Sequence, residues 1–341
     1  MAKVTLRDVA EAAGVSIATA SWAVNDNRDV QITESTRRKV RRAADELGYH
    51  HNALARGLAR GCSDIIGFIS DGVATSPFAG QVIQGAQDEA WRNGKILLVV
   101  DTDGRKDVER RTFSFMFEHQ VEGIIYSKWV HGSITPPDEL GRMPSVLVNC
   151  YDECGRFPAV PDEVQGGATA TRLLLEAGHR RIAFVNDAAL SPASVGRLAG
   201  YKAALARFDV DFDPSLVLSV TADQEGGYGA AAQVLATGAT GVFCHNDRTA
   251  LGLYDALRES GKRMPDDISV VGFDNQEVIS AHMHPALTTV GLPQYDLGVM
   301  GVRTLLRRCG ADNDESEIVS ERFKPVHVQC PAVPRDSVRT L

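Results

Sequence analysis

The sequence predicts a small all-α headpiece followed by an α/β body of two doubly wound lobes. Near the N-terminus, residues 4–25 have the pattern of two short helices joined by a tight turn. From Asp64 onward, short apolar runs alternate with amphipathic segments, and this theme occurs twice in succession. At 341 residues the chain exceeds one usual domain, so a headpiece and a two-lobed body both fit.

The first predicted helix begins after Thr5, whose side chain can cap it together with Asp8 in a capping box. Gly14 follows where the chain must turn, because glycine tolerates a positive φ angle. The apolar positions at helical spacing, which we expect to face inward, are Leu6, Val9, Ala10 and Ala13.

The second predicted helix is capped by Ser16, with Ala20 and Val24 directed towards the first helix. Its other face carries Ile17, Ala18, Ser21, Trp22 and Asn25. This is the layout of a helix-turn-helix, whose second helix lies in the DNA major groove. An ordinary hairpin of two helices is the alternative.

A third helix is predicted from about Thr33 to Leu47, ended by Gly48, with Val40, Ala43, Ala44 and Leu47 on its inner face. A further short helix is predicted from Asn52 to about Ala59. It has fewer than three turns and contains Gly57, so we expect it to fold only when paired and bound to DNA. A plain linker is the alternative.

Charge is divided unevenly along the chain, whose net charge is −8. Residues 1–62 hold ten Lys/Arg and seven Asp/Glu, a net of +3, which leaves −11 for residues 63–341. A basic headpiece on an acidic body fits a DNA-facing headpiece of modest electrostatic affinity. The basic run at 37–42 is either part of that surface or a solvated helix face.

The remaining composition predicts a cytoplasmic protein without cofactor or metal. The six cysteines are scattered without a zinc pattern, so we expect free thiols. No signal peptide and no run of 18 apolar residues is present, so no membrane segment is expected.

In the body, strands are predicted at 64–70, 95–100, 123–127 and 145–149, and again at 181–187, 216–220, 241–245 and 268–272. Helices between them are expected near 78–93, 107–120, 163–178, 195–208, 226–237 and 247–261. A strand at 287–290 is expected to cross between the lobes, and a helix at about 293–309 to return to the first.

Polar side chains gather at the carboxyl ends of these strands, where ligands bind in open α/β sheets. Asn149, Asn246 with Asp247, and Asp274 each end or follow a strand, while Arg197 is expected to open a helix. With the ring of Phe78, such groups suit a polyhydroxylated ligand. Capping or turn formation is the alternative for Asp274 and Asn246, and core packing for Phe78.

The chain resembles the lactose-repressor (LacI/GalR) family of bacterial transcriptional regulators over most of its length. The matching segments are TLRDVAEAAGVS at 5–16, residues 19–21, Asn25, TRRKV at 36–40 and LGYHHNALARGLA at 47–59. The body resembles the periplasmic-binding-protein-like type I sensor domain of the same family.

The resemblance implies an effector-controlled regulator, expected to be a repressor, that binds a pseudo-palindromic operator as a homodimer. The implied domains are a headpiece at 1–50, a hinge helix and linker at 51–62, and a two-lobed domain at 63–341, with the N-lobe at 63–160 and 291–320 and the C-lobe at 161–290 and 321–341.

The DNA contacts expected on this basis share the headpiece and hinge: Thr5, Leu6, Ser16, Ile17, Ala18, Thr19, Ser21, Trp22, Asn25, Thr36, Tyr49, Asn52, Ala55, Leu58 and Ala59. Leu58 would be the wedge inserted into the central minor-groove step. The expected effector contacts are Phe78, Ser127, Asn149, Ser191, Arg197, Asn246 and Asp274.

Several positions depart from the family pattern. His51 stands where proline is common, Asn149-Cys150 where many relatives have Asp-Arg or Asn-Arg, Leu292 where glutamine is frequent and Ala222 where some have an aromatic residue. A sugar or sugar derivative remains the expected effector despite these departures, with a purine-like or other small metabolite, or no effector, as alternatives.

The expected base-edge residues Ile17, Ala18 and Trp22 offer no bidentate hydrogen bonding. Ile17 and Ala18 can contact a thymine methyl group, and the polar residues around them suit phosphates. We therefore expect a larger share of readout from DNA shape and the hinge step.

Enzymatic function is not supported by the motifs present. After the first body strand the chain reads SDGVATSP rather than GxGxxG, and no phosphate-binding GxxxxGK[ST] or GxSxG motif occurs. His282 and His284 are expected in a surface loop. A solute-binding protein is a further alternative, opposed by the helix-turn-helix and the missing signal peptide.

Overall fold

The computed structural model describes residues 4–25, 30–49, 63–73, 80–152, 158–310 and 325–341. Contacts between residues divide the chain into two units, Met1–Ser63 and Asp64–Leu341. The predicted hinge helix at 52–59 and the residue Phe78 lie outside the described residues.

The first unit contains three helices, α1 (Leu6–Ala13), α2 (Ile17–Val24) and α3 (Glu34–Leu47). The predicted capping box is confirmed: the Thr5 side chain accepts from the Asp8 backbone N–H at 3.4 Å, and the Asp8 carboxylate accepts from the Thr5 N–H at 2.7 Å. Gly14 and Gly48 end α1 and α3 with φ angles of 59° and 64°. The helix boundaries expected for the headpiece are thereby confirmed.

Small apolar side chains form the core of this unit, namely Val9, Ala10, Ala13, Ala20, Ala23, Val40, Ala43 and Ala44. The placement of Leu47 on the inner face is wrong, because its side chain is 39% exposed. Arg37, one turn before Val40, is buried instead. Val24 is only half-buried, and Ala23 takes the inward position.

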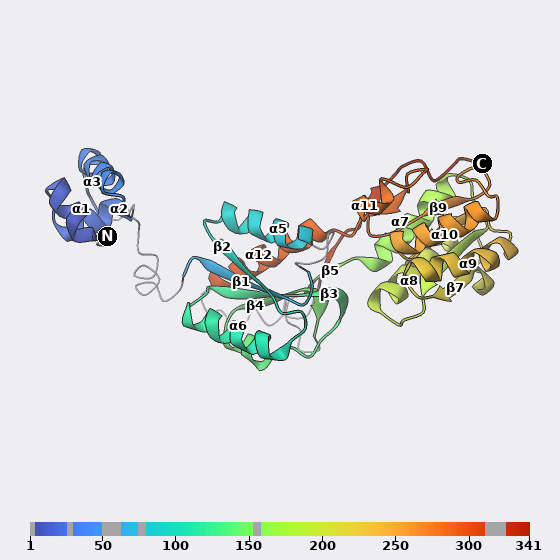
Figure 1. Ribbon diagram of the computed structural model, residues 1–341, viewed down its shortest axis with the longest axis horizontal. Helices are drawn as coiled ribbons and strands as arrows, with labels where there is room; N and C mark the ends of the chain where they lie inside the picture. Colours follow the sequence, from blue (N-terminus) through green and yellow to red (C-terminus); the bar gives the residue numbers. More distant parts are fainter. Residues whose placement is uncertain (1–3, 26–29, 50–62, 74–79, 153–157, 311–324) are drawn as a thin grey trace. The chain divides into compact units, whose positions relative to one another are not determined.

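The first lobe of the second unit is built on a parallel six-stranded sheet in the order β11-β5-β4-β3-β1-β2. Its strands are β1 (Ile65–Ser70), β2 (Ile96–Asp101), β3 (Gly123–Ser133), β4 (Ser145–Tyr151), β5 (Pro158–Pro161) and β11 (Val326–Val328). Helices α5 (Gly80–Arg92) and α12 (Gln294–Gly310) pack on one face, and α6 (Lys106–Glu118) covers the other (Figure 1).

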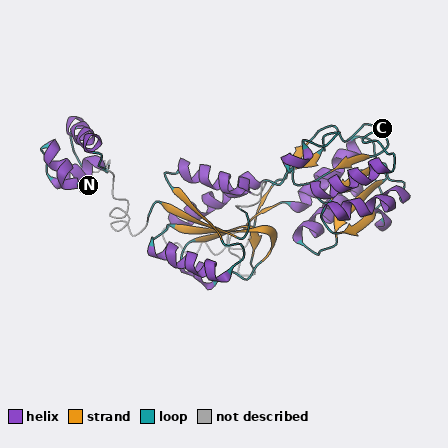
Figure 2. Ribbon diagram, viewed as in Figure 1, coloured by secondary structure: helices purple, strands orange, loops and turns teal. Residues whose placement is uncertain are grey.

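The second lobe has a parallel four-stranded sheet in the order β7-β6-β8-β9. Its strands are β6 (Ile182–Asp187), β7 (Val217–Val220), β8 (Gly241–Cys244) and β9 (Ser269–Val271). Helices α7 (Glu163–Glu176) and α8 (Pro192–Arg207) pack on one face, and α9 (Gln224–Ala236) and α10 (Asp247–Glu259) on the other. Strands and helices alternate in both lobes, as predicted (Figure 2).

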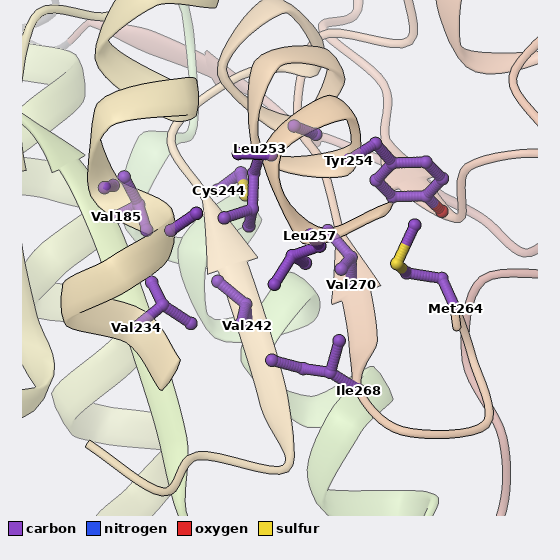
Figure 3. Close-up of a cluster of buried hydrophobic side chains, with 14 of the residues drawn as sticks. Val185, Val234, Val242, Cys244, Leu253, Tyr254, Leu257, Met264, Ile268 and Val270 are labelled. Atoms are coloured by element: carbon purple, nitrogen blue, oxygen red, sulfur yellow. The ribbon is translucent and has the colours of Figure 1, made fainter. Parts of the chain in front are cut away.

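The larger apolar core of the second lobe lies between its sheet and the helices α9 and α10 (Figure 3). Val185 and Val242 project from β6 and β8 towards Val234 of α9 and Leu253 and Leu257 of α10. All five side chains are fully buried. Continuous apolar strands are what a sheet covered on both faces requires, and the sequence shows them for this reason.

Three short segments join the lobes: 161–163 between β5 and α7, 290–294 between β10 (Thr289–Val290) and α12, and 328–332 between β11 and β12 (Ala332–Val333). The predicted return of the chain through α12 is confirmed by the packing of this helix on the first sheet. The strand predicted to cross at 287–290 is instead a two-residue strand, β10, paired antiparallel with β12.

The assignment of 321–341 to the second lobe alone is wrong, because β11 pairs with β5 in the first sheet. Several elements have no counterpart in the sequence prediction. They are β5, β11, β12, α11 (Glu277–Ser280) and the 3₁₀ helices at Asp138–Arg142 and Pro214–Leu216. β3 also extends six residues past its expected end, with a bulge between Ser127 and Gly132.

Candidate functional site

α2 presents an exposed apolar surface. Ile17 and Trp22 are 46% and 39% exposed, and Ala18 between them is also exposed. Single exposed apolar side chains are common, whereas several gathered on one face are typical of a contact surface. The three residues expected at base edges are thus all accessible to a partner.

The polar side chains around this surface have fixed positions, because they also hold the helix ends. Ser16 Oγ accepts from the Thr19 backbone N–H at 3.1 Å and shares a hydrogen bond of 2.8 Å with Thr19 Oγ1. Asn25 Nδ2 donates to the Ser21 carbonyl at 2.9 Å. The hydroxyls of Thr33 and Thr36 lie 2.8 Å apart at the start of α3.

Two further expected DNA contacts, Leu6 and Tyr49, are half-buried against the core of the first unit. The basic side chains of α3 partly neutralise neighbouring carboxylates, since Arg38 and Arg42 form exposed ion pairs with Glu34 and Glu46. Such pairs contribute little to stability. Asn52, Ala55, Leu58 and Ala59 lie outside the described residues.

Arg197 is the centre of a buried polar cluster in the second lobe. It lies in the second turn of α8, which begins at Pro192, so the expectation that Arg197 opens the helix is wrong. Its side chain is 4% exposed. Its Nε donates to Glu163 Oε2 at 2.8 Å, its Nη1 donates to the His245 carbonyl at 2.5 Å, and its Nη2 lies 3.6 Å from Asp274 Oδ1. The Phe273 ring packs against the guanidinium, with its centroid at 3.7 Å.

Glu163 connects this cluster to the first lobe. Its second oxygen, Oε1, lies 3.3 Å from Nδ1 of His131, on the extension of β3. Burial opposes ionisation of Glu163, but Arg197 and His131 outweigh it and lower its pKa to about 2. Glu163 is therefore a charged group held between a cation of the second lobe and a histidine of the first.

Asp274 is a buried carboxylate whose negative charge is balanced less fully by its neighbours than that of Glu163. It follows β9 with a φ angle of 100° and accepts from Gln276 Nε2 at 3.0 Å. Burial raises the pKa of Asp274, and Arg197 offsets this only in part, so the pKa is about 6. Burial and the nearby Asp274 likewise raise the pKa of Asp247 well above its usual range.

Asn246 and Ser191 have clear structural roles. Asn246 caps α10, with its Oδ1 accepting from the Thr249 N–H at 2.8 Å and its Nδ2 donating to the Ala222 carbonyl at 2.9 Å. Ser191 caps α8 in a capping box with Ser194. Capping, the alternative left open for Asn246 by the sequence, is therefore what its side chain does.

In the first lobe, Asn149 and Ser127 lie on the neighbouring strands β4 and β3, with Ser127 directly before the irregular part of β3. Asn149 has a φ angle of 57°, and its Nδ2 donates to the carbonyls of Lys128 and Trp129 at 2.9 and 3.1 Å, which holds the β3 extension in place. Ser127 is 1% exposed, and its hydroxyl has no hydrogen-bond partner among the described residues. Asp71 anchors the same extension through the Lys128 ammonium, at 2.6 Å.

A cavity of about 340 Å³ lies where residues of the two lobes meet. Its walls are formed by His131, Tyr151, Asp152, Val160, Pro161, Asp162, Glu163, Val164, Pro192, Gly196, Pro325 and His327. None of the described effector candidates is among them, although Ser191 and Arg197 each adjoin a wall residue in sequence. The structure brings Arg197 and Asp274 together, and Glu163 joins that pair to the cavity.

The sequence prediction missed the wall residues His131, Tyr151, Asp152, Asp162 and Glu163. Asp162 and Glu163 follow β5, whose sequence PAVP holds two prolines and so does not resemble a strand. His131 was hidden because β3 was expected to end at Ser127. The detectable signal was Asp162 itself, which caps α7 by accepting from the Gln165 N–H at 2.9 Å.

Within the part of the chain that the structure describes, no cluster of three or more His, Cys, Asp or Glu side chains could hold a metal ion. Over the same residues, no helix combines the length and apolar character needed to cross a membrane. His282 and His284 are exposed, as expected for a surface loop.

Two family models match the chain. The model described as "Bacterial regulatory proteins, lacI family" matches residues 5–52, and the "Periplasmic binding protein-like domain" matches residues 171–338. The chain is 33% identical over 342 residues to the HTH-type transcriptional repressor PurR of Vibrio atlanticus (strain LGP32), covering 99% of both chains.

Solved structures agree with this match. The lac repressor dimer bound to operator and the anti-inducer ONPF has a TM-score of 0.73 at 26% identity, covering 99% of this chain and 100% of that one. A complex of the transcriptional regulator CelR with cellobiose has a TM-score of 0.61 at 26% identity, covering 98% and 100%. The predicted headpiece and two-lobed fold are confirmed, and relatives that regulate transcription support the prediction that the chain is not an enzyme.

Proposed function

Because the chain belongs to the lacI family of bacterial regulatory proteins and is a DNA-binding transcriptional repressor, we propose that a small molecule bound between its lobes controls its affinity for an operator. The observation that carries this proposal is the buried chain of side chains from His131 through Glu163 to Arg197 beside the cavity. A ligand entering there changes contacts made by both lobes, and two-lobed proteins of this kind close around ligands by hinge motion.

We infer that the DNA-bound form is a homodimer on a pseudo-palindromic operator. α2 of each subunit would lie in the major groove, with Ile17, Ala18 and Trp22 at base edges and the surrounding hydroxyls and amides on phosphates. The exposure of Ile17 and Trp22 supports this role. The hinge segment at 52–59 would pair across the operator centre, with Leu58 as its wedge.

The proposed effector is a hydroxylated molecule, a sugar or sugar derivative in preference to a purine. The cavity offers the Tyr151 and His131 rings, whose centroids lie 6.0 Å apart in an edge-to-face arrangement, together with several carboxylates. Carboxylates accept hydrogen bonds from hydroxyls, and aromatic rings cover the apolar faces of sugars. The contacts proposed are Phe78, Ser127, Asn149, Ser191, Arg197, Asn246 and Asp274.

Similarity to a PurR protein makes a purine the second candidate, whereas similarity to a cellobiose complex favours a sugar. Coupling between effector and operator sites in regulators of this kind is about 1–3 kcal/mol, or roughly 5- to 150-fold in affinity. Gel retardation can measure a change in operator affinity of this size, and so shows which of the two candidate ligands causes it.

The test begins with selection of operator sequences from random DNA by the full-length protein. Gel retardation on a selected operator is then repeated with neutral sugars, amino sugars, sugar phosphates and nucleobases, using Arg197→Ala as the control for the ligand site. We expect an inverted repeat, and one ligand class that shifts operator affinity in the native protein alone. Failure to enrich any sequence would contradict the DNA-binding part. An operator response preserved in Arg197→Ala would contradict the proposed ligand site.

A further inference from the structure

Among the described residues that line the cavity between the lobes, carboxylates outnumber lysine and arginine side chains. Asp162 and Glu163 form part of its wall beside Asp152, which has an interaction partner of its own, and no lysine or arginine is present among the described wall residues. The other ionisable wall residues are Tyr151 and two histidines, and one of the histidines, His131, already faces Glu163 at 3.3 Å. A cleft lined by one sign of charge attracts ligands of the opposite sign.

Arg197 does not supply a free positive charge to balance this excess. Its Nε pairs with Glu163 at 2.8 Å, its Nη1 donates to the His245 carbonyl, and its Nη2 faces Asp274 at 3.6 Å. One guanidinium thus serves two carboxylates and one carbonyl. An incoming phosphate or carboxylate would have to displace Glu163, an exchange of one anion for another that leaves the buried Glu163 with only the His131 imidazole beside it.

Asp274 is the carboxylate of the cluster whose negative charge is balanced least by neighbouring groups. Among the described residues its nearest cation is the shared Arg197, too distant for a hydrogen bond, while Arg248 attracts it more weakly, and the side chain that donates to it is the neutral Gln276 amide at 3.0 Å. The raised pKa of Asp274 agrees with this shortage of positive charge. A cation from the ligand would complete the balance that the protein leaves open.

Two buried hydroxyls at the edge of the first sheet indicate the other half of the ligand. Ser70 ends β1, and Ser127 lies on the neighbouring strand β3, one residue beyond the paired positions Ile69 and Tyr126. Both side chains are at least 98% buried, and neither hydroxyl has a hydrogen-bond partner among the described residues. Buried hydroxyls are rarely left unpaired, so this pair marks a place where a polar ligand group is accommodated.

The two serines do not line the cavity, but they lie on the same sheet as the wall residues His131 and Tyr151 and towards the same carboxyl edge, because β1, β3 and β4 are parallel. We infer that the effector is a hydroxylated amine, such as an amino sugar, with its ammonium group directed to the carboxylates of the second lobe and a hydroxyl to Ser70 and Ser127. This inference rests on the proposed function, whose ligand class it narrows.

The test compares matched ligands on the full-length protein by thermal shift and calorimetry. The probes are glucosamine, galactosamine and mannosamine, each alongside its neutral parent sugar, its N-acetyl derivative and its 6-phosphate. We expect at least one free amine to bind at least about tenfold more tightly than its parent and its N-acetyl form, and the phosphates to bind more weakly still. Equal or tighter binding of a neutral or anionic member, or no binding by any amine at millimolar concentration, overturns the inference.

Asp162→Asn is the variant of choice, because asparagine caps α7 as well as aspartate does while removing one charge from the wall. We expect it to lower the ratio of amine to parent affinity about fivefold. Asp209→Asn, at an exposed position with a φ angle of 55°, is the matched control and should leave the ratio unchanged. An unchanged ratio in Asp162→Asn overturns the charge argument.

A second variant, Ser70→Ala, tests the proposed contact between the Ser70 hydroxyl and a hydroxyl of the ligand. Since the Ser70 hydroxyl has no partner among the described residues, its removal costs the fold little, and we expect weaker amine binding without a lower melting temperature. Amine binding unaffected by this change rules out the hydroxyl contact. Operator binding is measured in parallel on the selected DNA: its loss would refute the proposed function, whereas intact operator binding without an amine response refutes this inference alone.

Discussion

Replacing Asp274 by asparagine should stabilise the free protein at neutral pH while weakening its ligand site. Burial raises the pKa of this carboxyl from its ordinary value of 3.8 to about 6, so the ionised form is disfavoured by folding. A pKa unit corresponds to about 1.4 kcal/mol, and the cost of ionised Asp274 therefore reaches about 3 kcal/mol above pH 6.

The sign follows from proton uptake. Between the unfolded and folded pKa values, the folded state binds more protons than the unfolded state, so the stability of the native protein falls as pH rises through this window. At pH 4.5 the cost is about 1 kcal/mol, and at pH 7.5 it is about 3 kcal/mol. The advantage of Asp274→Asn should therefore grow by about 2 kcal/mol between these two pH values.

The replacement suits the site, since an asparagine oxygen can accept from Gln276 Nε2 as the carboxylate does, and Arg197 retains Glu163 as its partner. Groups that do not interact with Asp274 titrate alike in both proteins and cancel in the difference, whereas Asp247, whose ionisation the Asp274 carboxylate opposes, ionises more easily in the variant and so adds to its advantage at the higher pH. The assay is urea unfolding followed by circular dichroism at pH 4.5 and pH 7.5, with Asp209→Asn as the exposed control. A stability difference equal at the two pH values, or larger at pH 4.5, would refute the reasoning.

Three other substitutions test different parts of the molecule. Trp22→Ala should leave the stability of the headpiece within about 0.5 kcal/mol, because the side chain is 39% exposed, but weaken operator binding or change its sequence preference in gel retardation; unchanged binding would remove Trp22 from the DNA surface. Thr33→Ala should cost the headpiece about 1 kcal/mol through loss of the α3 cap, whereas Thr33→Ser should restore most of it in thermal unfolding, and equal melting temperatures would argue against the cap. Gly227→Ala would place a Cβ atom 2.0 Å from the Thr249 carbonyl oxygen, where α9 meets α10, and should destabilise the second lobe by at least about 2 kcal/mol. Gly229→Ala, two residues along the same helix and facing open space, should instead be neutral or stabilising by up to about 1 kcal/mol. Similar effects of the two substitutions would contradict the close packing of α9 on α10.

The local elements of this protein follow from short-range chemistry and were predictable for that reason. The capping box of Thr5, the positive φ angles of Gly14 and Gly48, and the apolar runs of the buried strands depend on a few neighbouring residues. The errors occurred where long-range pairing overrides local pattern. β5 forms from a proline-containing segment because its partners β4 and β11 supply the ladder, and β3 continues past Ser127 because Asn149 and Asp71 hold its extension.

The sequence by itself determined the headpiece, the alternation of strands and helices, and the polar residues such as Arg197 and Asp274 that end up side by side. Only the tertiary structure decided what these residues can still do. In the folded protein Arg197 pairs with Glu163, and the positive charge near Asp274 does not fully offset its burial. His131 of one lobe also contacts Glu163 of the other. Helix and strand periodicity is encoded within a few residues, whereas the charge balance of a buried site depends on groups tens of positions apart that only folding brings within a few ångströms.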